Sequence, residues 1–286
     1  MCTTDQFASI PLNRRQFGAM GAVGALAACT NMGGADGMAG VTQRNVSFAA
    51  DGGTIDGVFL HPAEGSHPGV ILWPDIAGLR PAKIAMGRRM AESGYAVFVA
   101  NPYYRSVAGQ QFADFDAFRA NDGFQKVGPW REANTPEAIM ATARSVVGWL
   151  DTQDAVDTSR GIGNQGYCMT GSWTIMTAAA VPSRVKAAGS FHGGGLVGDG
   201  AMSPVNLLDD MAADAGAYIA IAQDDDADAP GDKTALANAG SVAAADVQVK
   251  VYSGNHGWTV LDSPAYDEPE AERAWANLLE LYADKL

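Results

Sequence analysis

The stretch GIGNQGYCMTGSWTIMTAAA, residues 161–180, is the part of the sequence that decides the fold. Its first residues can end a buried strand and its last residues can form a helix. Between them, Cys168 stands at the nucleophile position of a G-x-S-x-G turn, a sharp strand-to-helix turn with small neighbours. Thr170 replaces the second glycine, and Gly171 follows one place later. A cysteine after a strand can also be an inert apolar residue, so this turn needs support from the rest of the chain.

Two polar elements downstream give that support. The acidic run at residues 224–226 follows an apolar segment, residues 218–222, and His256 follows another, residues 247–252. Nucleophile, acid and histidine is the chain order of an α/β-hydrolase triad, and each candidate comes just after a predicted strand. His192 precedes the acidic run, so we interpret it as a structural or pocket-lining histidine rather than as the base.

At these motifs the sequence resembles the dienelactone hydrolase family, over about residues 45–286. The resemblance implies one α/β-hydrolase domain, with a mostly parallel, twisted sheet flanked by helices. It also implies a hydrolase of small esters or lactones that uses a Cys-His-Asp triad and a backbone oxyanion hole, without a metal or organic cofactor. The matching segments are Pro74-Asp75-Ile76-Ala77-Gly78, Gly166-Tyr167-Cys168-Met169-Thr170-Gly171, Phe191-His192-Gly193-Gly194, the acidic loop that ends at Pro230, and Asn255-His256-Gly257-Trp258.

The resemblance assigns the members of the triad. Cys168 is the expected nucleophile, and His256 is the expected base that activates it. Asp225 is the expected carboxylate that orients the histidine, because its distance before Pro230 matches the family better. Asp226 remains the alternative for that role.

The loop after the strand predicted at residues 69–73 is expected to carry further parts of the site. α/β-Hydrolases take one amide of the oxyanion hole from this loop, and we assign it to Ile76; the other is the amide of Met169. In the dienelactone hydrolases an acidic residue in this loop interacts with the thiol and takes its proton, and Asp75 stands at that position. The alternative is that Asp75 caps the helix predicted from Pro81.

An irregular insertion is predicted from residue 101 to about residue 134. Its aromatic residues indicate a loop packed over the domain, one wall of the substrate pocket, or both. Tyr104 and Arg105 leave a strand at the active-site edge and are candidates for substrate contact. The family's name reaction uses a carboxylated lactone gripped by arginines, yet no arginine lies between His256 and Arg273. The missing clamp favours a different ester or thioester, or a clamp supplied elsewhere.

The N-terminus is predicted to be a targeting signal rather than part of the fold. A twin-arginine pair with an aromatic, Asn13-Arg14-Arg15-Gln16-Phe17, precedes a short apolar run, so residues 1–28 resemble a twin-arginine export signal. The segment that ends at Cys29 resembles a lipobox, and we predict that Cys29 is lipidated; ordinary cleavage nearby is the alternative. Residues 29–42 are then a flexible tether and residues 43–286 the hydrolase domain. The protein is predicted to be periplasmic and anchored to the membrane only by this lipid.

Composition restricts the function further. The chain has 286 residues, of which 47% are hydrophobic, and a formal net charge of −13, so it is a poor candidate for binding nucleic acid. Its histidines show no metal-ligand spacing, and we predict no metal. A small ester or lactone is the expected partner. Two alternatives on the same fold stay open: a catalytically silent lipoprotein that binds a ligand, supported by Thr170, and a thiol redox sensor that uses Cys168.

Hydrophobic patterns predict alternating strands and helices after an N-terminal hairpin, whose turn is the Asp-Gly-Gly at residues 51–53. The predicted strands are residues 45–49, 55–60, 69–73, 95–100, 161–165, 185–191, 218–222 and 247–252. The predicted helices are residues 81–93, 135–151, 172–180, 233–245 and 269–286.

Overall fold

The structure is a computed structural model, and it describes residues 40–286. The export signal, the lipidation site at Cys29 and nearly all of the tether lie outside the described residues and stay predictions. Within residues 40–286, no helix has both the length and the apolar character that crossing a membrane requires.

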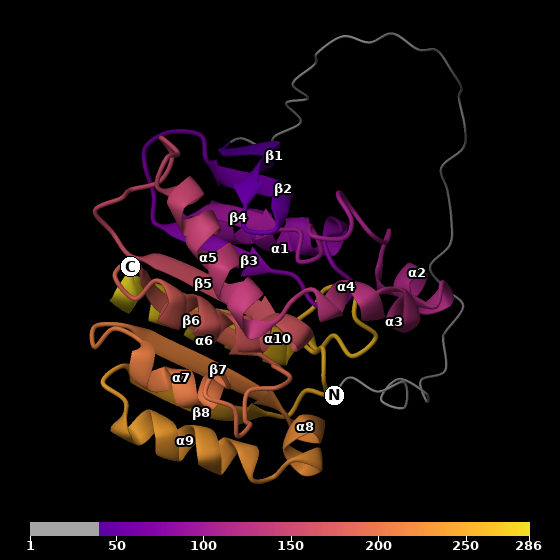
Figure 1. The fold of residues 1–286 in the computed structure, drawn as a ribbon, viewed down its shortest axis with the longest axis vertical. Helices are drawn as coiled ribbons and strands as arrows, with labels where there is room; N and C mark the ends of the chain where they lie inside the picture. The colour runs from indigo at the N-terminus through magenta and orange to yellow at the C-terminus, as the bar shows by residue number, and fades with distance from the viewer. Residues whose placement is uncertain (1–39) are drawn as a thin grey trace, which may run out of the picture.

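An eight-stranded sheet forms the centre of the molecule (Figure 1). Its strands are β1 (Val41–Ala50), β2 (Gly53–Pro62), β3 (Gly69–Trp73), β4 (Ala96–Ala100), β5 (Ile162–Tyr167), β6 (Val185–Phe191), β7 (Gly216–Ala222) and β8 (Asp246–Tyr252). They lie in the order β1-β2-β4-β3-β5-β6-β7-β8. β2 pairs antiparallel with both β1 and β4, and every other pairing is parallel. The predicted mostly parallel sheet is confirmed.

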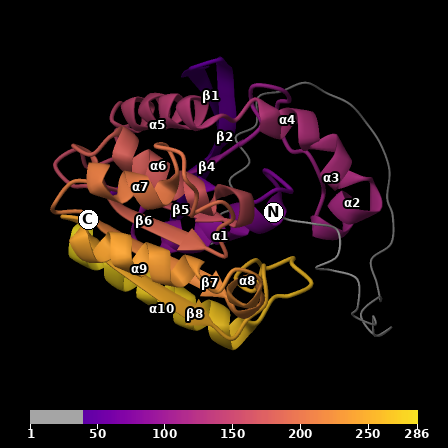
Figure 2. The same ribbon diagram turned by 60° about the horizontal axis from the view of Figure 1, so that its bottom comes forward.

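Helices cover both faces of this sheet (Figures 1 and 2). They are α1 (Pro81–Glu92), α2 (Phe115–Ala120), α3 (Gly123–Lys126), α4 (Gly128–Glu132), α5 (Pro136–Leu150), α6 (Gly171–Ala180), α7 (Pro204–Leu207), α8 (Gln223–Asp228), α9 (Asp232–Val242) and α10 (Glu268–Lys285), with the 3₁₀ turns η2 (Cys168–Thr170) and η3 (Leu208–Asp210). α5, α6, α7 and α9 pack on one face of the sheet, and α1 and α10 pack on the other. The fold is therefore the predicted single α/β domain.

Burial explains why the strands differ in their hydrophobic patterns. Every residue of β3 and β4 is buried, the continuous apolar pattern of parallel strands that are covered on both faces. β1 lies at the sheet edge and is largely exposed, so its pattern alternates instead. The hairpin turns at Gly52, whose φ of +78° is a left-handed conformation that glycine adopts without strain.

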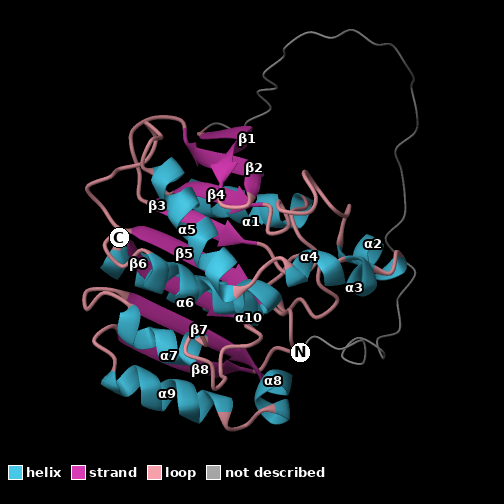
Figure 3. Ribbon diagram, in the orientation of Figure 1, coloured by secondary structure: helices cyan, strands magenta, loops and turns pink. Residues whose placement is uncertain are grey.

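The insertion at residues 101–134 differs from the prediction, because it contains the three short helices α2, α3 and α4 (Figure 3). Asp114 caps α2 by accepting a hydrogen bond from the amide of Ala117 at 2.7 Å. These helices have only four to six residues each, too few for a helical hydrophobic period to show in the sequence. Aromatic residues of the insertion pack against Ile76 and Cys168, so this segment is a cap over the carboxyl edge of the sheet.

The candidate residues lie at the carboxyl ends of the parallel strands. Open α/β sheets bind their ligands at this edge. Asp75 and Ile76 follow β3, Cys168 follows β5, His192 follows β6, Asp225 lies on α8 directly after β7, and His256 follows β8.

Candidate active site

Cys168 has a backbone conformation that few non-glycine residues adopt. It stands directly after β5 with a φ of +54°, and only 5% of its surface is exposed. A left-handed φ in a non-glycine residue costs energy, and such residues concentrate at functional sites. β5, η2 and α6 thus form a sharp strand-to-helix turn of the predicted kind, with the cysteine at its apex.

Small and hydrogen-bonding neighbours build this turn. A Cβ atom at Gly166 would lie 2.2 Å from the carbonyl oxygen of Thr170, so glycine is required for the close approach. Thr170 is the departure from the G-x-S-x-G pattern. Its hydroxyl donates to the carbonyl oxygen of Trp73 at 2.8 Å and accepts from the amide of Tyr167 at 3.0 Å. The threonine therefore ties the turn to β3.

His256 and Asp225 form an acid–histidine pair. Nδ1 of His256 lies 2.9 and 2.8 Å from the two carboxylate oxygens of Asp225. Because a carboxylate can only accept, Nδ1 carries the proton, and Nε2 of the neutral ring is left as a proton acceptor. Asp224 accepts a hydrogen bond from the backbone amide of His256 at 2.8 Å, whereas Asp226 binds Nζ of Lys233 at 2.7 Å. Of the three acidic residues, Asp225 is the one that faces the imidazole.

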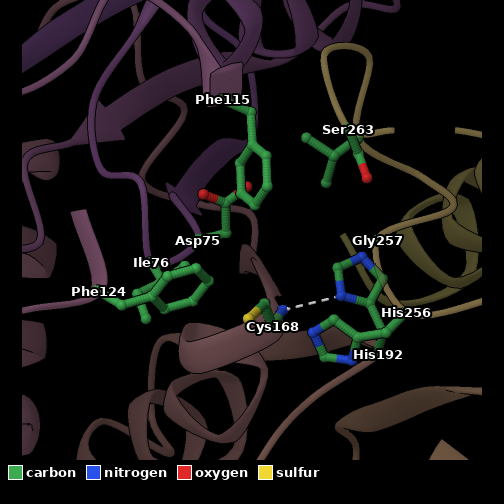
Figure 4. Close-up of a pocket in the computed structure, with 10 residues that line it drawn as sticks. Asp75, Ile76, Phe115, Phe124, Cys168, His192, His256, Gly257 and Ser263 are labelled. Carbon is green, nitrogen blue, oxygen red and sulfur yellow. Dashed lines mark hydrogen bonds between the residues drawn. The ribbon is translucent and has the colours of Figure 1, made fainter. Parts of the chain in front are cut away.

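A second histidine holds the backbone of the cysteine (Figure 4). Nδ1 of His192 accepts a hydrogen bond from the amide of Cys168 at 3.1 Å, so its proton lies on Nε2, 3.1 Å from the hydroxyl of Thr259. The rings of His192 and His256 meet edge to face, with centroids 4.9 Å apart. Burial, together with His256 nearby, holds the pKa of His192 well below its usual range, so this ring is neutral.

A small cavity lies beside the thiol, and both imidazoles line it (Figure 4). Its volume is about 20 Å³, room for about one water molecule. Phe115 and Phe124 of the insertion and Val260 of the histidine loop also line it. Ile76, one of the two residues assigned to the oxyanion hole, also lines the cavity, and the other, Met169, follows the cysteine directly. Among residues 40–286, no group of three or more His, Cys, Asp or Glu side chains is arranged to hold a metal ion.

Comparison with known proteins identifies the family. The sequence profile of the dienelactone hydrolase family matches residues 55–286. The chain belongs to the dienelactone hydrolase family. It is accordingly an α/β-hydrolase that acts on ester bonds. A Salmonella typhi protein, provisionally named a carboxymethylenebutenolidase, is 26% identical over 251 residues, which are 86% of this chain and 87% of the relative.

Solved structures share the dienelactone hydrolase fold. A Klebsiella pneumoniae protein, provisionally named a dienelactone hydrolase, has a TM-score of 0.65 at 22% identity, over 85% of this chain and 98% of that chain. A dienelactone hydrolase-like promiscuous phosphotriesterase from metagenomic libraries also has a TM-score of 0.65, at 20% identity, over 86% of this chain and 99% of that chain.

In this member of the family, Asp75 lies at the cavity but is held by two cations. Its Oδ1 accepts from Arg80 at 2.7 Å and from the amide of Ala77 at 2.9 Å, and its Oδ2 lies 2.9 Å from Nζ of Lys83. Burial alone would raise the pKa of Asp75, but Arg80 and Lys83 outweigh burial and hold this pKa below its usual range. Such a carboxylate is a poor acceptor for a thiol proton. Nor does Asp75 cap α1, whose N-cap residue is Arg80. Its place is in a buried ion-pair cluster.

Arg80 extends this cluster across the site. Its guanidinium is fully buried and also donates to both carboxylate oxygens of Asp262, each at 2.8 Å. Asp262 accepts from the amide of Phe115 at 3.0 Å as well. Burial lowers the pKa of Arg80, but Asp75 and Asp262 outweigh it and raise this pKa, so the guanidinium stays charged. The cluster joins the loop after β3, the insertion and the histidine loop. No sequence pattern predicted this cluster, because Arg80 and Asp262 lie 182 positions apart without a shared motif.

Tyr104 and Arg105, predicted to contact substrate, are not among the residues that line the cavity at the thiol. The hydroxyl of Tyr104 donates to the carbonyl oxygen of Asp51 and lies 2.9 Å from the hydroxyl of Thr142. Arg105 donates to the carboxylate of Asp51 at 3.1 Å and to the carbonyl oxygen of Ala138 at 2.9 Å. In this structure both side chains tie the β1–β2 turn to α5, because the hairpin places its acceptors beside the end of β4. Their contact with substrate stays a prediction.

Proposed function

We propose that this family member is a cysteine-dependent hydrolase of small esters or lactones. Cys168 is the nucleophile, His256 is the general base, and Asp225 orients and stabilises the imidazole. One observation carries the proposal. Cys168, with its left-handed backbone conformation at the end of a strand, and His256 line the same cavity. The carboxylate of Asp225 holds Nδ1 of His256, so the basic Nε2 points away from that carboxylate.

The first half of the reaction acylates the enzyme. Nε2 of His256 takes the thiol proton as the sulfur of Cys168 bonds to the carbonyl carbon. The carbonyl oxygen becomes an oxyanion, which the backbone amides of Ile76 and Met169 stabilise. When the tetrahedral intermediate collapses, the bond to the leaving oxygen breaks, and this oxygen takes the proton from His256. The product is a thioester on the cysteine. An ester releases its alcohol at this point, whereas a lactone keeps the new hydroxyl on its acyl group.

The second half releases the acid. Water gives a proton to Nε2 of His256 as its oxygen bonds to the thioester carbon, and the same amides hold the second oxyanion. Collapse breaks the carbon–sulfur bond, and the proton returns from the imidazole to the sulfur of Cys168. The carboxylic acid leaves, and the enzyme regains its starting state. Asp225 stays ionised throughout and stabilises the imidazolium that forms in each half.

The walls of the cavity favour an uncharged substrate. The names of the relatives, carboxymethylenebutenolidase and dienelactone hydrolase, denote lactones, which supports a lactone or a similar ester. Phe115, Phe124 and Val260 are apolar, and Arg80 already binds two carboxylates. No arginine follows His256 on its loop. A substrate carboxylate would therefore lose water here without gaining a free cation, which is costly.

Turnover of p-nitrophenyl acetate and of simple lactones tests this proposal. We expect the purified protein to hydrolyse them and Cys168→Ala to lose at least about a thousandfold in kcat, because removing a nucleophile leaves only the other parts of the site. Equal turnover by the variant would reject the nucleophile. Alkylation by iodoacetamide separates the two alternatives if no ester is turned over: a reactive thiol favours a redox sensor, and an unreactive thiol favours a silent binding protein.

We also propose that the enzyme is exported by a twin-arginine signal and anchored in the periplasm through lipid on Cys29. The sequence pattern of residues 1–29 supports this location. Fractionation of cells that express the full chain tests it. The wild type is expected with the membranes, and Cys29→Ser is expected in the soluble fraction or unprocessed. Recovery of both in the same fraction would contradict lipidation.

A further inference from the structure

A second and much larger cavity is also lined by Ile76. Its volume is about 630 Å³, against about 20 Å³ for the cavity beside the thiol. Ile76 lines both, and Met169 lines the larger one. Thus the two residues that we assign to the oxyanion hole stand where the two cavities adjoin. The small cavity holds about one water molecule, so most of a bound ester must lie elsewhere.

The chemistry assigns a direction to each part of the substrate. In the tetrahedral intermediate on Cys168, the oxyanion faces the amides of Ile76 and Met169, and the leaving oxygen must face His256 to receive its proton. His256 lines the small cavity and not the larger one. The leaving oxygen therefore faces the small cavity, and the acyl chain is left to point past Met169. We propose that the larger cavity is the acyl-binding groove, a proposal that rests on the function proposed above.

The walls of the groove define the acyl group that fits. Its floor is apolar: Ile139 of α5 and Trp173 and Met176 of α6 are each at most 6% exposed. From Met169 to Met176 the groove follows the η2–α6 segment for about 10 Å at a rise of about 1.5 Å per residue. Charged side chains, Arg131 among them, belong to α4 at its exposed rim. The acyl group that matches this groove is an uncharged chain of medium length, because a charge on the apolar floor would be unpaired.

Gly194 supports this assignment. In the run Gly193-Gly194-Gly195, a Cβ atom at Gly193 would lie 2.5 Å from Oγ of Ser190, and Gly195 has a φ of +69°, so both glycines have structural reasons. Gly194 lines the groove, has no left-handed φ, and a Cβ atom there would meet nothing within 4 Å. Its amide donates to the carbonyl oxygen of Cys168 at 3.0 Å, which a side chain would leave intact. The open space beside Gly194, which a side chain would fill, is therefore part of the groove.

A chain-length series tests the groove in the full-length enzyme. The measurement is kcat/KM for p-nitrophenyl acetate, butyrate, hexanoate and octanoate. In the wild type we expect kcat/KM to rise by up to about fourfold for each methylene that the groove buries. Gly194→Phe fills the groove and is expected to lower the octanoate-to-acetate ratio of kcat/KM at least about tenfold. Gly200→Phe is the matched control, since this loop glycine also has open space around it and lies away from the groove. The control is expected to keep the wild-type ratio.

The outcomes separate the groove from the chemistry. An unchanged ratio in Gly194→Phe, or a wild-type kcat/KM that falls with chain length, would overturn the proposed acyl-binding groove and leave the proposed hydrolase function intact. If the wild type cleaves no ester, the proposed function fails, and calorimetric titration with the uncharged octanamide still decides the groove. Octanamide that binds the wild type at least about tenfold more tightly than Gly194→Phe supports it. Absent or equal binding rejects it.

Discussion

Two carboxylates stand at the carboxyl edge of the same sheet, and their surroundings differ. The Asp225 side chain is 25% exposed and faces the imidazole of His256. The Asp75 side chain is 5% exposed and lies between Arg80 and Lys83. Each follows a parallel strand, and the sequence analysis gave each a candidate role in activating Cys168 or its histidine.

The contrast shows that charge partners, rather than position along the sheet, decide what a carboxylate does. Opposite an imidazole, a carboxylate gains a partner each time the ring becomes protonated, so it contributes to the transition state. Between two permanent cations, a buried carboxylate is already compensated, and its main contribution is to hold those cations in place. We therefore propose that Asp225 takes part in the reaction and that Asp75 stabilises the fold, and five measurements test this distinction.

The largest expected effect is on turnover at Asp225. Asp225→Asn should lower kcat by about 10³–10⁴-fold, because an amide neither fixes the Nδ1–H form of His256 nor stabilises the imidazolium. Asp226→Asn is the matched control and should stay within about threefold, since a change to a partly exposed ion pair has a small effect and Asp226 binds Lys233. Steady-state kinetics with p-nitrophenyl acetate measures both. Similar losses in the two variants would remove the distinction within the acidic run.

The next effect is on stability at Asp75. Asp75→Asn should lower the free energy of unfolding by about 3–5 kcal/mol, because it leaves buried cations without their counter-charge. Urea denaturation measures this loss, and adding Lys83→Met should recover part of it by removing one of those cations. A variant of normal stability that has lost its turnover would instead give Asp75 a role in the chemistry.

Replacing His192 tests whether a neutral histidine positions the nucleophile. His192→Phe removes the acceptor of the Cys168 amide and should lower kcat/KM by about 10–100-fold, the size of effect that a small misplacement of a reacting group produces. The rate of alkylation of Cys168 by iodoacetamide should fall as well, with the unfolding transition followed in parallel. Unchanged alkylation and turnover in a folded variant would show that the turn keeps its shape without this histidine.

Lys83 predicts a dependence of stability on pH. Burial lowers its pKa, Asp75 opposes the shift and Arg80 reinforces it, and the result is about 8 against 10.5 for the free side chain. Between these values the unfolded state binds more protons, so stability rises with pH. From pH 8 to 9.5, the free energy of unfolding should rise by about 1–2 kcal/mol more in the wild type than in Lys83→Met. Parallel pH profiles would show that Lys83 is not a desolvated cation.

The smallest effect is expected at Tyr104, whose hydroxyl binds Asp51 and Thr142 rather than either carboxylate. Tyr104→Phe removes hydrogen bonds to Asp51 and Thr142 and should lower the free energy of unfolding by about 1 kcal/mol. kcat/KM should change less than about twofold, because surroundings away from the reacting atoms contribute little to the transition state. Thermal denaturation and steady-state kinetics measure the two quantities. A large fall in kcat/KM with unchanged stability would restore the predicted substrate contact.

Sequence patterns predicted the fold because they record local periodicity. Strands such as β4 are continuous apolar runs, and each candidate residue follows one of these strands. Because the strands are parallel, the candidate residues come together at one edge of the sheet. Family membership and the sheet are confirmed. The pairing of Asp225 with His256 agrees with the predicted triad, although the catalytic roles remain proposals.

The remainder depended on contacts that no local pattern contains. The preference for Asp225 within the 224–226 run came from the family resemblance, because no local pattern gives the direction of side chains on α8, a helix of six residues. Tyr104 leaves its strand at the expected edge, yet the hairpin beside β4 supplies acceptors that turn it away. Asp75 is bound by residues five and eight places along the chain, but a cation at those positions equally suits an exposed helix, so only burial distinguishes the two cases.

The bridge made by Arg80 has a consequence for biosynthesis. Its two carboxylate partners, Asp75 and Asp262, belong to opposite ends of the domain, and the arginine is fully buried between them. A ribosome-bound chain that lacks the last part of the domain cannot complete this bridge. Arg80 therefore has only Asp75 as its carboxylate partner until almost the whole polypeptide has been made.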